Sequence, residues 1–521
     1  MGRNPYSSGS VAHSLGIDVG STNAKVVLVA EDGTLVGRSS RPIPMLRVGD
    51  TATQDPRALW AAVVDAIREL TSAHPRAASD VAAVGTCSQY SSIVPVDAKG
   101  EPVDELLLYL DTRGTDHCFA IMERHPEAFD TWIEHHGIPP IGSGLSLGHM
   151  LHFQHDRPEG LEATTAWLEV MDLVTTRLTG RITATQSTMF TAQLCDNRTL
   201  GVTSYDPDLV AMSGVDADRL PPLVAPDAVI GEMLPSMADD LGLPRGVVVA
   251  AGMNDSHAGA FATGAFAAGT TGLSIGTTAV LLDTFDRMAV DLDHEVLSMP
   301  SPLAGHYLVW AENGMAGKSV EHVLGELVHA SDALGDHGSE QPFAALNAAL
   351  AATEPGANGV LFLPWLTGSF SPHADRSVRG GFLNLSLDAR RIDLVRAAVE
   401  GTAHNLRWLL PFVERFAGRA GDRIVFGGGA ARSELWAQIV ADVLQRPVAT
   451  LTHPDHAVAR AAGLVGLQRV GVLPAGDLSD HVDVGATFEP DEATADLYAH
   501  RQTQFEAAFD ALRPLHQALN P

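Results

Sequence analysis

Two short segments, about half the chain length apart, share one pattern of strand, tight turn and strand. In both, an apolar strand ends at a glycine followed by two hydroxyl residues, and a second apolar strand leaves. Such a turn directs backbone N–H groups and hydroxyls to one place, which suits phosphate oxygens. The repeat therefore predicts a duplicated domain whose two turns face one nucleotide. The turn residues are Gly20, Ser21 and Thr22 in the first copy and Gly276, Thr277 and Thr278 in the second.

The two copies differ at one position that carries charge. Asp18 precedes the first turn, at the place that Ser274 holds in the second copy. Hard cations such as Mg²⁺ prefer oxygen ligands, carboxylates among them. The first turn is therefore the expected metal side, with Asp18 as the metal-binding residue.

Length and charge narrow the class of protein. With 521 residues, the chain is too long for a single core, so two large domains with additions are expected. The 34 basic residues stand against 63 acidic ones, a net charge of −29, which repels polyanions. We expect neither nucleic acid nor an anionic membrane as partner.

Cysteine content and the first residues favour a reducing compartment. Only Cys87, Cys118 and Cys195 occur, with no close pair that would indicate a disulfide framework or a zinc site. The stretch 1–12 lacks the apolar core of a signal peptide, and 246–282 is interrupted by charge and glycine. We expect a soluble, cytoplasmic protein, and a homodimer stays open.

The first half alternates strand and helix patterns, which predicts α/β layers. Asp55 and Pro56 form a favourable helix start, and apolar residues follow at helical spacing up to Leu70. A strand is expected at 81–85, and the loop 86–92 follows it. Open α/β sheets bind ligands at the carboxyl ends of their strands, so this loop, with Gln89, is expected to face a ligand.

Two later segments carry groups suited to catalysis and nucleotide binding. A strand is expected to end at Gly252, with a helix of small residues beginning near Asp255, whose carboxyl either caps the helix or stays free for chemistry. Three glycines from Gly427 follow another strand, where the bare backbone can pass against a flat ring, and Ser433 is expected to cap the next helix.

Taken in order, these segments resemble the FGGY family of carbohydrate kinases, within the actin-like ATPase and sugar kinase fold. The resemblance extends from about Leu15 to the last helix. It implies an α/β protein with two duplicated actin-like, ribonuclease H-like domains and a nucleotide cleft between them. We expect the N-terminal domain at 14–258, the C-terminal domain at 259–475 and an extension with an amphipathic helix at 476–521.

The resemblance implies ATP and Mg²⁺ as cofactors and a role for each matching residue. Asp255 matches the catalytic base of the family, and Asp18 would hold Mg²⁺. Lys25 matches a family Arg or Lys that clamps charge, but it could equally be an exposed strand residue. The residues expected to bind ATP are Gly20, Ser21, Thr22, Lys25, Gly276, Thr277, Thr278, Gly317, Gly428, Gly429, Ala430 and Ser433. The residues expected to bind the sugar are Gln89, Tyr90, Ser91, Asp111, Asn254 and Asp255.

The chain departs from the family pattern at two places. Tyr90 and Ser91 replace the Met and His of the family's sugar loop, and Ser369-Phe370 replace a Glu-Arg pair. The pair Asp111 and Arg113 matches a family motif but could also be a surface ion pair. A group of histidines between 135 and 152 has no carboxylate or cysteine at ligand spacing, so a metal site is not expected there.

The function implied is ATP-dependent phosphorylation of a sugar hydroxyl, with a small-molecule sugar as partner. A ketopentose such as xylulose is the first expectation, and the small Ser91 hydroxyl leaves another ketose, an aldonate or a polyol as alternatives. Two further readings stay open, a kinase remnant that has lost its substrate and an actin-like nucleotide switch protein without a sugar site, because fold does not fix function.

Overall fold

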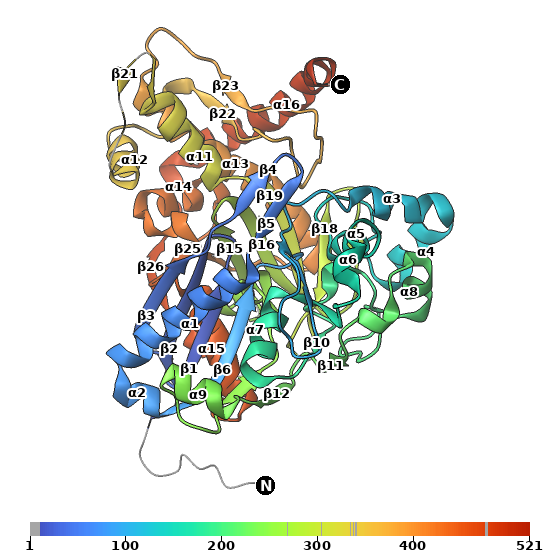
Figure 1. Cartoon of the computed structure of the whole chain (residues 1–521). Helices are drawn as coiled ribbons and strands as arrows, with labels where there is room; N and C mark the ends of the chain where they lie inside the picture. The colour runs from blue at the N-terminus through green and yellow to red at the C-terminus, as the bar shows by residue number, and fades with distance from the viewer. Residues whose placement is uncertain are drawn as a thin grey trace.

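The computed structural model describes residues 11–267, 269–303, 305–333, 335–336, 338, 341–474 and 478–520. The expected domain boundary at residues 475 and 476 lies outside them. Figure 1 shows the sheet of the first half at the lower left, the second half above it, and at the right the helices within residues 115–161 and 207–213, labelled α3 to α6 and α8. The prediction of an α/β protein built from two domains is confirmed.

The elements of the first half are as follows. Its strands are β1 (His13–Val19), β2 (Asn23–Ala30), β3 (Leu35–Pro42), β4 (Leu46–Val48), β5 (Thr51–Gln54), β6 (Val81–Ser88), β7 (Ile93–Val96), β8 (Leu106–Leu107), β9 (Ala166–Glu169), β10 (Ala184–Thr185), β11 (Leu223–Val224), β12 (Val229–Glu232), β13 (Val248–Ala250) and β14 (Met253–Asn254). Its helices are α1 (Pro56–Ala73), α2 (Pro75–Ser79), α3 (Thr115–Arg124), α4 (Ala128–His135), α5 (Ser146–Asp156), α6 (Pro158–Leu161), α7 (Val170–Thr179), α8 (Pro207–Ser213), α9 (Pro235–Leu241) and α10 (Asp255–Thr263).

The second half continues in the same style. Its strands are β15 (Thr270–Ile275), β16 (Thr278–Phe285), β17 (Val290–Asp291), β18 (Val296–Pro300), β19 (Tyr307–Met315), β20 (Ser331–Asp332), β21 (Gly335–Asp336), β22 (Leu361–Leu363), β23 (Gly381–Leu383), β24 (Arg423–Gly427), β25 (Val448–Leu451) and β26 (Val484–Phe488). Its helices are α11 (Gly317–His322), α12 (Pro342–Ala351), α13 (Arg391–Ala417), α14 (Glu434–Leu444), α15 (Ala457–Arg469) and α16 (Ala495–Leu519).

The two large sheets repeat one arrangement, as the paired turns predicted. In the first, β1 pairs antiparallel with β2 and parallel with β6, within the order β12-β13-β6-β1-β2-β3. In the second, β15 pairs antiparallel with β16 and parallel with β24, within the order β17-β18-β19-β16-β15-β24-β25-β26. Each predicted phosphate turn therefore joins the first two strands of its own sheet.

Local signals fixed several helix starts. Asp55 accepts a hydrogen bond from Arg57 N at 2.9 Å and caps α1, and the apolar stripe up to Leu70 is buried. Ser433 likewise caps α14. The strand expected at 81–85 is longer than predicted, because β6 runs to Ser88 and hydrogen-bonds β14 there.

Two helices cross between the halves and hold them together. α10 follows the first sheet in sequence yet packs against β15 and β24 of the second, while α15 follows the second sheet and packs against β1 and β6 of the first. The contact with the first sheet needs glycine, because a Cβ at Gly16 would lie 1.9 Å from the Ala459 carbonyl oxygen. At Gly85 the same distance to the Ala462 oxygen would be 1.8 Å. This close approach fixes α15 on the first sheet.

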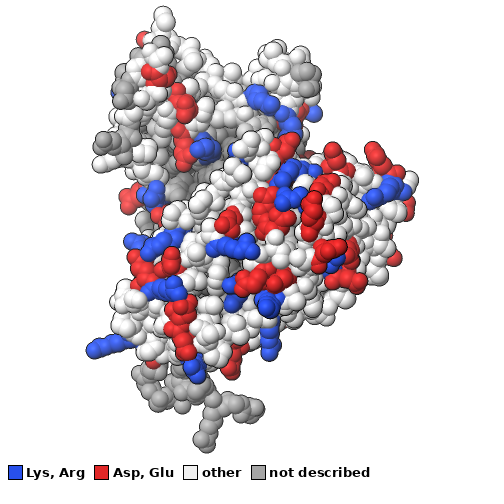
Figure 2. All heavy atoms as spheres, viewed as in Figure 1, with Lys and Arg blue, Asp and Glu red and all other residues white. Residues whose placement is uncertain are grey.

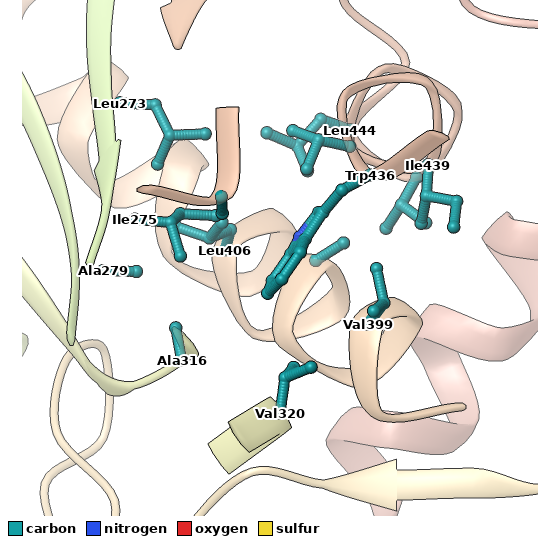
Figure 3. Close-up of a cluster of buried hydrophobic side chains, with 14 of the residues drawn as sticks. Leu273, Ile275, Ala279, Ala316, Val320, Val399, Leu406, Trp436, Ile439 and Leu444 are labelled. Atoms are coloured by element: carbon teal, nitrogen blue, oxygen red, sulfur yellow. The ribbon is translucent and has the colours of Figure 1, made fainter. Parts of the chain in front are cut away.

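The main core of the second half lies directly behind its phosphate turn. Figure 3 shows Trp436 of α14 between Ile275 and Leu406 on one side and Val399 and Ile439 on the other. These side chains come from β15, α13 and α14, and all are buried. Since Ile275 directly precedes Gly276, the packing of this core determines where the turn lies.

The visible surface, the helices and the cysteines of the described residues have the following features. On the face in Figure 2, basic and acidic side chains are interspersed, and no broad basic area is visible among the described residues. Within the described ranges, every helix is too short or too polar to cross a bilayer. The three cysteines are free and buried.

Candidate active site

Strand register brings Asp18 and Asp255 to one edge of the first sheet. Asp18 lies opposite Cys87 in the parallel pair β1–β6, and Cys87 lies opposite Met253 in the pair β6–β14. Asp18 is thus on the same row as Met253, and Asp255 begins α10 two residues further along. Residues 237 positions apart in sequence meet because the carboxyl ends of parallel strands lie together.

The two carboxyls raise the charge density at this edge. Burial, and after it the charge of Asp18, raises the pKa of Asp255 to about 7. Burial also raises the pKa of Asp18, while the charge of Lys25, its cross-strand neighbour, lowers it. Two neighbouring carboxyls with raised pKa values favour a bound cation, and oxygen donors suit Mg²⁺. The donor set therefore fits the expected metal.

The carboxyl of Asp255 is not used to cap its helix. Asn254 is the N-cap of α10, and its side-chain oxygen accepts a hydrogen bond from His257 N at 2.8 Å. The alternative that Asp255 serves only as a cap is wrong. Its half-buried carboxyl remains available for chemistry.

The first phosphate turn and the loop 89–92 are joined by one glutamine. Gln54 donates to the Ser21 carbonyl oxygen at 2.7 Å and accepts from Gln89 at 3.3 Å. The backbone N–H of Gln89 donates to the Val19 carbonyl at 2.9 Å, next to the turn. Sequence reasoning missed Gln54, because it lies on β5 and is brought to the turn only by the fold.

Aromatic and acidic side chains from both halves surround Asp255. Tyr90 and Tyr109 both have raised pKa values, chiefly from burial and then from the charge of Asp255, with Glu312 contributing to each. Glu312 lies on β19 of the second half, and burial raises its pKa. Glu312 was not predicted, since no local pattern distinguishes an acidic residue within a strand. These shared electrostatic neighbours place the two halves face to face around Asp255.

Asp111 is fully buried and engaged by its neighbours. It accepts from Ala52 N at 2.9 Å and from the Arg113 guanidinium at 2.7 to 3.0 Å. Burial would raise the pKa of Asp111, but these hydrogen bonds outweigh it and hold the pKa below its usual value. Asp111 therefore ties Arg113 to β5 from a buried position.

Three segments of the second half converge on Gly276. A Cβ at Gly317 would lie 2.1 Å from the Gly276 carbonyl oxygen, and one at Gly428 would lie 2.5 Å from the Ile275 oxygen. The Lys318 N–H donates to the Thr277 carbonyl at 3.2 Å. The residues predicted to bind nucleotide in this half are therefore neighbours in space.

The turn after β24 contains residues of two kinds. The short helix η5 (Gly429–Arg432) includes Ala430, which is buried, whereas a Cβ at Gly429 would meet no atom within 4 Å. The Ser433 hydroxyl is buried, accepts from Trp436 N and donates to Asn347 at 2.5 Å. Gly429 thus faces open space, while Ser433 shapes the turn through its cap.

Ser369-Phe370 replace the Glu-Arg pair of the family, and an arginine lies further along the same segment. The Arg376 guanidinium lies 4.0 Å from the centroid of the Phe370 ring. Its charge lowers the pKa of Glu312, against the effect of burial. Arg376 therefore supplies positive charge beside the site from six residues further along the chain.

The histidines dismissed as metal ligands include one with carboxylate neighbours that are distant in sequence. His135 lies 2.8 Å from Asp206, and with Asp208 they form one cluster of possible metal-binding atoms. One Asp206 oxygen already accepts from two N–H groups at the start of α8. Asp206 is therefore already engaged, by a hydrogen bond with His135 and as a helix cap.

Comparison with known proteins supports one family across the chain. Residues 13–262 match the profile described as "FGGY family of carbohydrate kinases, N-terminal domain", and residues 269–468 match that of the C-terminal domain. The chain is 25% identical to a xylulose kinase of Staphylococcus epidermidis over 96% of its own length and 97% of that protein. It is 23% identical to a gluconokinase of Bacillus subtilis over 94% and 93%.

A solved structure gives the same picture of the fold. The xylulose kinase of Rhodospirillum rubrum superposes with a TM-score of 0.82 at 24% identity, covering 97% of this chain and all of that one. This similarity supports the two-domain fold.

Proposed function

The chain belongs to the FGGY family of carbohydrate kinases and is an ATP-dependent sugar kinase, and we propose that it phosphorylates a ketose or aldonate hydroxyl with Asp255 as general base. A ketopentose such as xylulose is the first candidate substrate. The observation that carries the proposal is the place of the Asp255 carboxyl, which lies near Asp18 while Asn254 caps the helix. A cytoplasmic location, suggested by three free cysteines, is part of the proposal.

Asp255 would accept the proton of the attacking hydroxyl. A general base works best when its pKa lies near the working pH, and burial brings that of Asp255 to about 7. Its position at the first residue of α10, with Asn254 as cap, holds the carboxyl at a fixed place. Phosphoryl transfer depends mainly on such positioning and on charge neutralisation.

The two turns would hold the phosphates of ATP from opposite sides. Gly20 to Thr22 in the first half and Gly276 to Thr278 in the second offer backbone N–H groups and hydroxyls. Mg²⁺, when bound, would neutralise phosphate charge, with Asp18 as its protein ligand and Lys25 as an additional positive charge. The adenosine would lie over Gly429, where the structure leaves open space.

The sugar would bind on the side of the first half. Gln89, Tyr90 and Ser91 form the loop next to Asp255, and Asp111 holds the neighbouring segment through Arg113. Asn254 lies beside the base, with a buried side-chain nitrogen that has no hydrogen-bond partner among the described residues. An unpartnered buried donor is costly unless a ligand accepts from it, so Asn254 suits a sugar hydroxyl.

The choice of sugar is tested with a substrate panel. We expect ATP-dependent ADP release to be stimulated by at least one of D-xylulose, D-ribulose, D-gluconate, glycerol and xylitol. The kcat/KM of D-xylulose is expected to differ from that of the best other sugar by no more than about a hundredfold in either direction. This factor corresponds to roughly 2.7 kcal/mol. Dominance of D-xylulose by a larger factor would show that Ser91 does not loosen its selectivity.

The same assay separates a kinase from a switch protein. A nucleotide switch would hydrolyse ATP slowly at a rate that no sugar changes. The matched control is the variant Asp255→Asn, which should bind ATP but give no sugar-stimulated ADP release. Failure of every sugar in the panel to stimulate the wild type would contradict the proposed function.

A further inference from the structure

A fully buried carboxyl lies directly behind the loop expected to bind the sugar. Glu169 is the last residue of β9 and has no exposed surface. It lies opposite Ile93 in the antiparallel pair β7–β9, and Ile93 is the first residue after the loop 89–92. A buried carboxyl away from the reacting groups needs a structural reason, because its desolvation is costly.

Glu169 accepts hydrogen bonds from three different segments. One oxygen accepts from the backbone N–H of Ser92 at 3.0 Å. The other accepts from the hydroxyl of Ser146, the first residue of α5, and from that of Thr191 at 3.4 Å, in the short helix η1 (Phe190–Ala192). The two hydroxyls are themselves 2.8 Å apart. One side chain thus links the loop to α5 and η1.

The loop itself has a conformation that needs such support. Ser91 has φ of +56°, in the left-handed region that residues other than glycine seldom adopt. Non-glycine residues in sparsely populated backbone regions are strained and persist only where the surroundings determine their conformation. The Ser92 N–H that follows is fixed by Glu169, and Tyr90, one residue earlier, lies near Asp255.

Among the described residues, the groups that shift the pKa of Glu169 include no cation. Burial raises the pKa of Glu169 to about 8, opposed by the hydrogen bonds from Ser146, Ser92 and Thr191. The titratable groups that face it are Asp172 of α7, whose pKa burial and Glu169 both raise, and Tyr90 of the loop. At neutral pH a protonated Glu169 has one oxygen that accepts from Ser92 and a hydroxyl that can bond Ser146 or Thr191.

We propose that Glu169 is a positioning residue that holds the loop Gln89–Ser92 in its sugar-binding conformation by tying Ser92 to α5 and η1. The inference rests on the proposed function only in taking this loop as the sugar side of the site. Glu169 touches neither ATP nor the reacting hydroxyl, so its loss should affect sugar binding more than turnover.

Two variants with opposite expectations test the role. Glu169→Gln keeps an oxygen that can accept from Ser92 and an amide that can donate to the two hydroxyls. Glu169→Leu leaves the Ser92 N–H unpaired and leaves the two hydroxyls only each other as partners. With MgATP and either D-xylulose or D-gluconate, we expect Glu169→Leu to raise the sugar KM at least tenfold. We expect its ATP KM to stay within twofold and Glu169→Gln to stay close to the wild type. Asp172→Asn, at a buried carboxyl without a bond to Ser92, is the matched control.

Hydrogen exchange gives a readout that needs no sugar. In the unliganded protein, peptides covering residues 88–96 should exchange faster in Glu169→Leu than in the wild type, with Glu169→Gln unchanged. If Glu169→Leu does not fold, Glu169→Asp, one methylene shorter, should show the same faster exchange. Unchanged exchange and an unchanged sugar KM in the variants would overturn the inference, as would a Gln variant as impaired as the Leu variant. An inactive wild type whose loop still depends on Glu169 would contradict the proposed function alone.

Discussion

Asp18 and Asp255 are chemically identical side chains whose places in the site differ. Asp18 lies within a strand, buried and opposite Lys25, whereas Asp255 begins a helix and is half-buried. The first is therefore suited to hold a cation and the second to exchange a proton with a substrate. Their proximity also couples them, because the charge of Asp18 raises the pKa of Asp255.

Replacing each aspartate should give a different signature. Asp255→Asn should reduce sugar-dependent kcat by about 10²- to 10⁴-fold, because the amide cannot accept the proton. Its ATP affinity and melting temperature should change little, since Asn254 caps α10. Asp18→Asn should raise the Mg²⁺ concentration needed for half-maximal activity and weaken ATP binding. Steady-state kinetics with Mg²⁺ titrations and calorimetric ATP binding measure both effects.

A third variant distinguishes loss of the base from damage to its helix. Asn254→Ala removes the cap of α10 and should lower the melting temperature, at a cost of about 1 kcal/mol. Asp255→Asn should not. Retention of more than about a tenth of wild-type kcat by Asp255→Asn would exclude Asp255 as the general base.

Glu169 should also make stability depend on pH. Its pKa rises from an ordinary 4.5 to about 8 on folding, so the folded state binds a proton that the unfolded state releases between these values. The contribution of Glu169 to stability is therefore complete below pH 4.5 and decreases as pH rises towards 8. The slope is at most about 1.4 kcal/mol per pH unit.

Thermal melts of Glu169→Gln against the wild type test this dependence. Because Gln cannot ionise, the melting temperature of the variant should rise steadily relative to that of the wild type from pH 5 to pH 8. The exposed Glu162→Gln is the control and should show no such trend. If the difference in melting temperature between variant and wild type stays constant from pH 5 to pH 8, Glu169 is ionised in the folded protein throughout this range.

At the scale of elements, the turn between β24 and α14 contains one glycine that is closely packed and one that is not. Gly428 has φ of +82° and faces the Ile275 carbonyl, whereas Gly429 faces open space. The turn is held in place by Ser433, which caps α14, and by Trp436 in the core behind it (Figure 3). One glycine thus serves the fold, and its neighbour serves the proposed nucleotide site.

Alanine at the two positions should separate these roles. Gly428→Ala should lower the melting temperature, because its Cβ would lie 2.5 Å from the Ile275 oxygen in a backbone conformation that L-residues rarely adopt. Gly429→Ala should leave stability unchanged and raise the KM for ATP several-fold, because its Cβ enters the space proposed for adenosine. An unchanged ATP KM in Gly429→Ala would argue against adenosine at this turn.

At the scale of the whole molecule, the two halves are joined by helices that each pack on the other half's sheet. α10 begins at Asp255 and packs on the second sheet, and α15 packs on the first. The chain between α10 and β15 includes Gly264 and Gly269, both with positive φ. We expect the glycine-rich span 259–272 to be the hinge between the two halves. Within this span, Ala268 lies outside the described residues.

The halves should close when both substrates bind. Closure would keep water from the γ-phosphate and bring Glu312 of the second half towards Tyr90 and Tyr109 of the first. Small-angle scattering should give a smaller radius of gyration with sugar and a non-hydrolysable ATP analogue than for the free protein. The sugar alone serves as the control. An equal radius in all states would contradict a closing cleft.

Local patterns in the sequence were enough for the repeated turns, the α/β class and the starts of α1 and α14. Glycine-hydroxyl turns, the Asp55-Pro56 start and the Ser433 cap are short-range features, because the groups that satisfy them lie within a few residues. The resemblance to the FGGY family likewise rested on ordered motifs, and the family matches confirm it.

Only the tertiary structure decided which of these features act together. It placed Asp18 beside Asp255, buried Asp111 in an ion pair and brought Gln54, Glu312 and Arg376 to the site. The longer β6 and the hydrogen bond between Glu169 and Ser92 also depend on partners far away in sequence. The physical reason is that pairing between strands and burial of a charge depend on which segments meet, and one sequence read alone does not contain these distances.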